Sequence, residues 1–174
     1  MHPARKPLET LELEVKFEAT RSTGPGGQHR NRVATAIRAT HIPTNVSAMG
    51  TERRSQLENK KMALYRLRHK LALHHRSDIQ DSDLCPPAAY QPSAEWTKRL
   101  KGQKIKVNVA HDDFPALLAE VLDRLHVDMD NIADTASAFR VSNSQLIKFL
   151  ASDQHALHEL NVRRKKSGQK PLRA

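Results

Sequence analysis

Cysteine is almost absent from this 174-residue sequence, which contains only Cys85. A single cysteine excludes an intrachain disulfide and is typical of a protein from a reducing compartment. No apolar run approaches the roughly 18 residues that a membrane span needs, and residues 1–6 lack the apolar core that follows the basic residues of a secretion signal. The sequence therefore predicts a cytoplasmic protein with no membrane partner.

Acidic residues are also in short supply, with 19 Asp and Glu against 29 Lys and Arg, a formal net charge of +10 and a pI near 10.0. This balance favours a polyanionic partner. Residues 1–75 carry a net +8 (14 basic, 6 acidic) and residues 161–174 a net +6 (6 basic, none acidic). Residues 111–160 carry a net −6 (3 basic, 9 acidic). We therefore expect phosphate contacts at the two ends of the chain and not in the acidic stretch.

The N-terminal region has the pattern of a small sheet. Residues 11–18 alternate apolar and charged side chains without a break, which is the period of a strand with one buried face. Residues 36–42 and 46–49 indicate two more strands, joined by a turn at residues 43–45. A meander of three antiparallel strands is the simplest arrangement.

A helix follows the sheet. Ser55 and Glu58 have the spacing of a capping box, in which each side chain satisfies a free backbone N–H at the helix start. Leucines recur at helical spacing and predict an apolar stripe that packs on the sheet. They are Leu57, Leu64, Leu67 and Leu71. Basic residues cover much of the remaining helix surface, which can face phosphates.

The second half of the chain changes character. Asp, Ser and Pro residues, including Pro86 and Pro87, predict a linker over residues 76–103. Residues 105–109 alternate like a strand, and helical patterns begin at Asp113. Expected helix caps are Asp130 and Ser142, with a last helix starting near Asp153.

The fold class expected is α+β, with a small, mainly antiparallel sheet and a packed helix followed by a helical C-terminal region. The expected division of the chain is a first domain at residues 1–75, a linker at 76–103, a strand-plus-helix region at 104–160 and a basic tail at 161–174.

The segment that carries chemistry is residues 21–32, which read RSTGPGGQHRNR. Three glycines and a proline in four positions exclude a helix or strand interior, and glycine lets a ligand approach the main chain closely. Several N–H groups can then hold an oxyanion or a phosphate. The Lys-Ser/Thr ending of a nucleotide-binding loop is missing. From composition alone, an ordinary surface loop remains open as the alternative.

This segment resembles the GGQ domain of class I peptide chain release factors and of the smaller ribosome-rescue hydrolases. The resemblance rests on the run from Arg21 to His29 and on Asn31, and it continues through residues 38–44, 52–56 and 59–60 in the same order. It covers roughly residues 8–75. Where the family usually has a small apolar residue and then Asn-Lys, this chain has Arg30-Asn31-Arg32, and Arg30 adds positive charge beside the loop.

The resemblance implies catalytic roles for Gly26, Gly27 and Gln28. The glycines allow the backbone shape of the loop, the main-chain N–H of Gln28 stabilises developing negative charge, and the Gln28 side chain positions water. It implies no side-chain nucleophile, no cofactor and no metal, and it makes Gln28 a candidate for N-methylation. The implied partners are the ribosome, through large-subunit rRNA and P-site peptidyl-tRNA, and a glutamine methyltransferase. We expect the chain to be a monomer.

Basic residues near the loop, on the helix and in the tail are expected to contact RNA phosphates. They are Arg21, His29, Arg30, Arg32, Arg53, Arg54, Lys60, Lys61, Arg163, Arg164, Lys165 and Lys166.

The function predicted is codon-independent release of nascent chains from stalled ribosomes. The sequence shows no counterpart of a stop-codon-reading domain, and neither recognition tripeptide, Pro-x-Thr nor Ser-Pro-Phe, stands in a suitable context. One alternative is a release-factor-like protein that binds ribosomes or rRNA but no longer hydrolyses. Another is a DNA-binding regulator that uses a helix-turn-helix-like hairpin at residues 130–151, for which the acidic balance is unfavourable.

Overall fold

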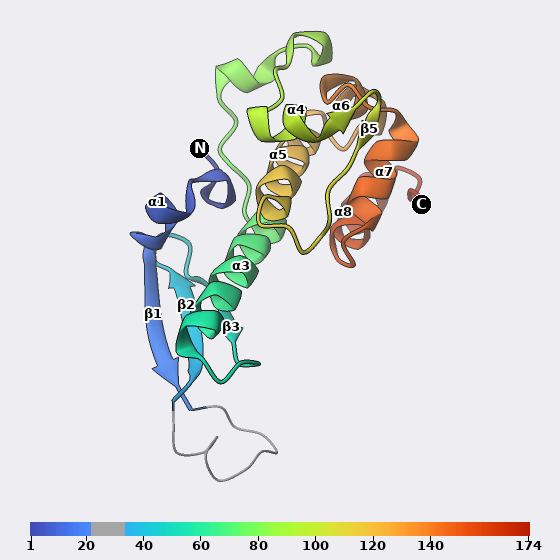
Figure 1. The fold of residues 1–174 in the computed structure, drawn as a ribbon. Coiled ribbons are helices and arrows are strands. Elements are labelled where there is room, and N and C mark those ends of the chain that lie inside the picture. The colour runs from blue at the N-terminus through green and yellow to red at the C-terminus, as the bar shows by residue number, and fades with distance from the viewer. Residues whose placement is uncertain (22–33) are drawn as a thin grey trace. The chain divides into compact units, whose positions relative to one another are not determined.

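The computed structural model describes residues 1–21 and 34–174 (Figure 1). The chain divides into two compact units, Met1–His75 and Arg76–Ala174. The expected α+β class is confirmed, because a small antiparallel sheet with a packed helix is followed by a helical region.

The unit Met1–His75 is built on an antiparallel sheet whose described strands run in the order β1-β2-β3. Its elements are η1 (Pro3–Arg5), α1 (Leu8–Glu12), β1 (Val15–Thr20), β2 (Ala36–His41), β3 (Val46–Gly50) and α3 (Gln56–His74). The helix α3 lies across one face of the sheet, mainly over β2 and β3 (Figure 1). Leu64, Leu67 and Leu71 of α3 are buried there, as is Ala39 of the central strand.

The prediction of one strand over residues 11–18 is wrong for the first half of that segment. Leu8–Glu12 is the short helix α1, and β1 begins only at Val15. The alternation of Leu and Glu misled the prediction, because Leu11 is fully buried while Leu13 is 85% exposed. The two leucines therefore do not share one face of a strand.

One leucine of the predicted stripe on α3 does not join the core. Leu57 is 64% exposed because it lies in the first turn, before the helix makes its closest approach to the sheet at Asn59 and Ala63. The Ser55 half of the predicted capping box is confirmed, since the Ser55 hydroxyl accepts a hydrogen bond from the N–H of Glu58 (3.4 Å).

Side chains of α3 cover the carbonyl groups of β3, which is an edge strand of this sheet. Arg66 Nη1 donates to the Met49 carbonyl (2.9 Å), and Lys70 Nζ donates to the Ser47 carbonyl (3.0 Å). Arg66 is also paired with Glu52 (2.6 Å). These two basic side chains therefore support the sheet.

A buried histidine joins the start of β1 to the turn after β2. His41 is 1% exposed, and its Nε2 donates to Glu14 Oε2 (3.1 Å). Lys6 Nζ donates to the other oxygen of Glu14 (2.5 Å), and His41 Nδ1 lies 2.8 Å from the Thr44 hydroxyl. Glu14 thus connects the N-terminal segment to the sheet.

Acid is expected to weaken this connection. The hydrogen bond from Lys6, followed by that from His41, holds the pKa of Glu14 below its ordinary value of 4.5. A carboxylate with a lowered pKa stabilises the fold above its unfolded pKa, and this contribution is lost as pH falls through the folded value. We expect Glu14→Gln to make the loss of unfolding free energy below pH 4.5 less steep, as measured by urea denaturation at a series of pH values. An equally steep decline in the variant would contradict this.

The unit Arg76–Ala174 is mainly helical. Its elements are η2 (Asp81–Leu84), η3 (Pro87–Ala89), α4 (Ala94–Arg99), β4 (Leu100–Lys101), β5 (Lys104–Ile105), α5 (Phe114–Val127), α6 (Ile132–Ala138), α7 (Asn143–Ala151) and α8 (Ala156–Lys166). The apolar face of α5 is fully buried along its length. An aromatic cluster of Trp96, Phe114, Phe139 and Phe149 completes the core, and Trp96 Nε1 donates to the Phe139 carbonyl (3.1 Å).

The segment 76–103, expected to be a linker, differs from that expectation because two buried charged residues of α5 bind it. Glu120 is 1% exposed and accepts hydrogen bonds from the Tyr90 hydroxyl, the Ser93 N–H and the Ser93 hydroxyl. Arg124 is 4% exposed and donates to the carbonyls of Asp83 and Cys85. The prolines of this segment begin or flank short helices.

Other boundaries in this unit also shift. The strand expected at residues 105–109 is limited to Lys104–Ile105, since the chain leaves the β4–β5 hairpin at once. The N-cap of α6 is Asn131, whose side chain accepts from two backbone N–H groups, and not Asp130, which instead pairs with Arg163 (2.6 Å). Ser142 caps α7 as predicted.

The expected basic tail at 161–174 is half helix. Residues up to Lys166 belong to α8, and the chain after it folds back. Asn161 Nδ2 donates to the Leu172 carbonyl (3.0 Å), and Asn161 Oδ1 accepts from the Leu172 N–H (2.7 Å).

Candidate catalytic hairpin

The candidate catalytic segment connects β1 to β2. The last pair of this hairpin that the structure describes is Thr20 with Ala36. Gly26, Gly27, Gln28, His29, Arg30 and Arg32 lie outside the described residues. The structure instead defines the base from which the segment starts and to which it returns.

Two amide side chains of α3 hold the returning chain. Gln56 Nε2 donates to the Ala34 carbonyl (2.6 Å), and Asn59 Nδ2 donates to the Thr35 carbonyl (2.7 Å). These carbonyls come directly before β2. The first two turns of α3 therefore hold the chain at Ala34 and Thr35, just before β2.

Asn59 makes further contacts that tie a second loop to the same point. Its Nδ2 also donates to the Arg53 carbonyl (2.7 Å), and its Oδ1 accepts from the Arg53 N–H (2.9 Å). The side chain is 0% exposed. Only an amide supplies both donors and the acceptor, because an aspartate has no N–H and a leucine has neither.

Gly50 allows the backbone of β3 to approach Asn59 closely. A Cβ at position 50 would lie 2.1 Å from the Asn59 carbonyl oxygen and 3.0 Å from the Ala63 nitrogen. Both are backbone atoms of a helix, so they do not move aside as the tip of a flexible side chain does. A glycine is required at this contact.

We expect Gly50→Ala to reduce the free energy of unfolding by about 3 kcal/mol, at the upper end of the usual cost of overpacking. Thermal unfolding followed by circular dichroism measures this loss. Gly102→Ala is the matched control, because no atom lies within 4 Å of its Cβ position, and its positive φ of +58° costs about 1–2 kcal/mol. Equal losses for the two variants would show that the contact with α3 is unimportant.

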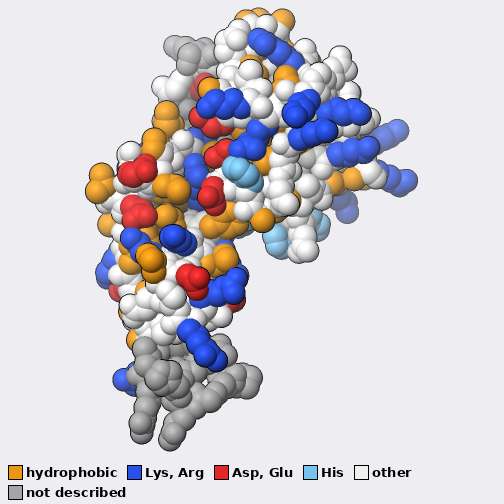
Figure 2. Space-filling model, viewed as in Figure 1, with side chains coloured by type: hydrophobic (Ala, Val, Ile, Leu, Met, Phe, Trp, Pro, Cys, Tyr) orange, Lys and Arg blue, Asp and Glu red, His pale blue; other side chains and the backbone are white. Residues whose placement is uncertain are grey.

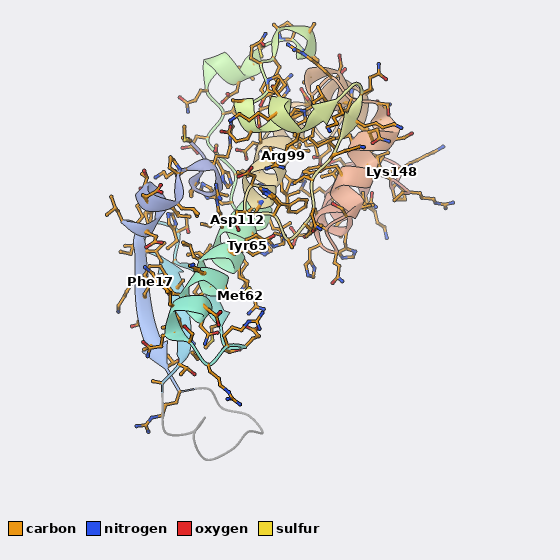
Figure 3. The ribbon with its side chains drawn as sticks, in the orientation of Figure 1. Phe17, Met62, Tyr65, Arg99, Asp112 and Lys148 are labelled. Carbon is orange, nitrogen blue, oxygen red and sulfur yellow. The ribbon has the colours of Figure 1, made fainter. Side chains whose placement is uncertain are left out.

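The predicted RNA-binding residues of this unit have different surroundings. Arg21, Arg53, Arg54 and Lys61 are exposed. Arg53 lies beside the base of the hairpin, since Asn59 binds both Arg53 and Thr35. Lys60 already has partners within the unit. Its Nζ is 2.7 Å from Glu12 and 4.4 Å from the centroid of the Phe17 ring, which is labelled on β1 in Figure 3.

The predicted RNA-binding residues of α8 also divide into two kinds. Arg163 pairs with Asp130 (2.6 Å), and Arg164 donates to the carbonyls of Asp130 and Lys170. Both arginines therefore hold the turn between α5 and α6 and the chain after α8. Lys165 and Lys166 are exposed.

Gln56, Asn59 and Gly50 were not predicted as site residues. The first two lie in the stretch that carries the family resemblance, and this signal could have identified them. Gly50 stands at the end of a strand, a position where glycine often marks a close backbone approach.

Among the described residues, no group of three or more His, Cys, Asp and Glu side chains is arranged to hold a metal ion. None of the helices found in residues 1–21 and 34–174 is both long enough and apolar enough to span a bilayer.

Comparison with known proteins identifies relatives of this hairpin. The model of the RF-1 domain matches residues 6–111, which include the whole hairpin and α3. The chloroplastic peptide chain release factor PrfB1 of Arabidopsis thaliana is 52% identical over 104 residues, 60% of this chain and 22% of that protein. Peptide chain release factor 1 of Leptospira biflexa is 40% identical over 128 residues, 69% of this chain and 36% of that protein. The chain thus spans about a third or less of the length of these relatives.

Proposed function

This chain belongs to the RF-1 domain family of class I peptide chain release factors, and from that premise we propose that it hydrolyses the ester bond of peptidyl-tRNA on the ribosome. The observation that carries the proposal is the combination of the segment 21–32 with its base. The segment has the family's Gly-Gly-Gln tripeptide within the matched residues, and α3 holds the chain next to it through Gln56 and Asn59.

The proposed reaction uses main-chain groups. Water attacks the ester carbonyl carbon, the bond from that carbon to the tRNA ribose oxygen breaks, and the ribose oxygen receives a proton. Negative charge develops on oxygen in the transition state, and the N–H of Gln28 stabilises it there. Gly26 and Gly27 allow the backbone conformation that presents this N–H, and the Gln28 side chain orients the water.

A base that is fixed on a helix suits this chemistry. Catalysis by placement needs reacting groups held close to the productive geometry. Asn59 is buried and uses both its donors and its acceptor. The start of β2 is therefore held in a fixed position relative to α3.

The finer proposal is codon-independent release on stalled ribosomes, with Gln28 as a site of N-methylation. Residues beyond the family match fold into α5–α8, and lysines are exposed on this unit. Contacts between such lysines and rRNA would provide binding that does not depend on a codon.

The experiment compares release of a labelled nascent peptide from ribosomes with an empty decoding site and from ribosomes programmed with a stop codon. Release from both classes is expected. Release only with the stop codon would remove the rescue function and keep the esterase. Binding without release from either class would favour the catalytically inactive alternative.

A further inference from the structure

One margin of the unit Arg76–Ala174 is lined by basic side chains (Figure 2), although the sequence of the unit's central part is acidic. At least seven of the nine acidic residues between 111 and 160 bind partners inside the unit. They are Asp113, Glu120, Asp123, Asp128, Asp130, Asp134 and Asp153. Four of them pair with arginines, so four of the nine negative charges of the stretch are neutralised within the fold.

The arginines in these pairs are committed to structure. Arg124 lies 2.7 Å from Asp128, with both side chains buried, and Arg99 lies 2.5 Å from Asp113. Arg163 lies 2.6 Å from Asp130. The cations left on the surface are mainly lysines.

Seven exposed lysines lie on or next to the β4–β5 hairpin, α7 and α8, which contact one another in series. The hairpin strand β5 packs against α7, and α7 packs against α8. We call the set on these elements and their flanks the lysine strip. Its members are Lys101, Lys104, Lys106, Lys148, Lys165, Lys166 and Lys170.

The figures show this gathering of charge. Lys and Arg side chains project from the margin of the unit that carries β5, α7 and α8, and no Asp or Glu side chain is visible among them there (Figure 2). Lys148 is labelled on α7 within this region (Figure 3). Among residues 76–80 and 83–174, no hydrogen bond or ion pair engages the side chains of the strip.

Folding explains only part of the strip. Lys101 and Lys104 stand directly opposite each other in the β4–β5 hairpin, where like charges are destabilising. Lys165 and Lys166 have one structural reason, because basic residues are favourable at a helix C-terminus. The same reason applies to Lys148 in the last turn of α7, but it does not apply to Lys101 or Lys104.

We infer that the lysine strip binds the phosphate backbone of ribosomal RNA. Lysines act as point charges on phosphates and carry no base preference, so the surface suits a polymer recognised by its backbone. The identity of that polymer rests on the proposed function, which places the chain on the ribosome. The contact adds affinity and does not take part in ester hydrolysis.

The test uses the full chain and purified vacant ribosomes. A variant with Lys104, Lys148, Lys165 and Lys166 changed to Gln is compared with one in which the same lysines are changed to Arg. The Gln variant is expected to bind about 10- to 100-fold more weakly at moderate salt, and its slope of log affinity against log salt should be shallower by roughly three. The Arg variant should match the natural chain in both respects.

Unchanged affinity and slope in the Gln variant would overturn the inference. So would binding of the natural chain to a DNA duplex but not to ribosomes, which would favour DNA recognition by the α6–α7 hairpin. The single variant Lys148→Glu provides a second measurement. It leaves the β4–β5 hairpin and α8 unchanged, and it should also weaken ribosome binding.

Release assays separate this inference from the proposed function. The Gln variant should require more ribosomes for half-maximal release and reach the same maximal rate. If the natural chain binds through the strip but releases no peptide, the proposed activity fails while the RNA contact stands. If release is normal and the Gln variant binds ribosomes as tightly as the natural chain, only the inferred RNA contact is wrong.

Discussion

Gly27→Ala is expected to lower the rate of peptidyl-tRNA hydrolysis about 100- to 1000-fold, the usual cost of losing one preorganised donor to a developing oxyanion. The added Cβ restricts the backbone that presents the Gln28 N–H. Ribosome affinity should stay unchanged, because the main-chain N–H acts on the transition state. Single-turnover release at saturating ribosomes measures the rate, and co-sedimentation measures the affinity.

Gln28→Ala is the companion variant. It keeps the main-chain N–H and removes the side chain, so we expect a smaller loss than with Gly27→Ala and less discrimination between water and other nucleophiles such as hydroxylamine. Equal rates for the natural chain and for Gly27→Ala would discard the main-chain mechanism.

The second large effect is expected from Asn59→Ala. The change leaves the carbonyls of Thr35 and Arg53 and the N–H of Arg53 without their partner, at a contact where Asn59 itself is 0% exposed. Each unsatisfied buried group costs about 1–3 kcal/mol, so we expect a loss of about 3–5 kcal/mol in the free energy of unfolding. Urea denaturation followed by circular dichroism measures it.

Gln56→Ala distinguishes positioning from stability. Gln56 is exposed and contributes one contact to Ala34, so its loss should cost no more than about 1 kcal/mol. We nevertheless expect slower release at saturating ribosomes, because one of the two contacts that place the end of the segment is gone. Ser55→Ala, which removes the neighbouring helix cap at a similar cost, is the control and should release at the natural rate. Identical rates for Gln56→Ala and Ser55→Ala would show that the base does not position the segment.

The parts of the fold that sequence could predict are those set by local pattern. The strands around the Thr44 turn, the helix after Ser55 and the cap at Ser142 all depend on residues near one another in the chain, and each is confirmed. Periodicity failed at residues 11–14, where the same Leu-Glu alternation suits a strand and a single helical turn.

What could not be predicted depends on contacts between distant residues. Glu120 and Arg124 carry charge on a helix whose apolar face was correctly placed, yet both are buried because residues 83–93 supply their partners. Asn59 is similar, since its amide is satisfied by residues from two separate loops. Periodicity ranks such polar residues as surface, and only the tertiary structure shows that they are internal.

The sequence could therefore predict only some of the residues of the candidate catalytic hairpin and its base. The tripeptide Gly26-Gly27-Gln28 could be recognised as a motif. Gly50 could not be assigned, because its requirement comes from the Asn59 carbonyl on a helix that follows it in the chain.

The covered carbonyls of β3 have a consequence for how this protein behaves at high concentration. A strand from a second molecule that approaches β3 needs free acceptors to extend the sheet, and Arg66 and Lys70 already occupy those of Met49 and Ser47. Lys70 also places a positive charge at that border, which disfavours the approach of an identical border. At high concentration, we therefore expect Arg66 and Lys70 to disfavour the pairing of β3 with a strand of another copy.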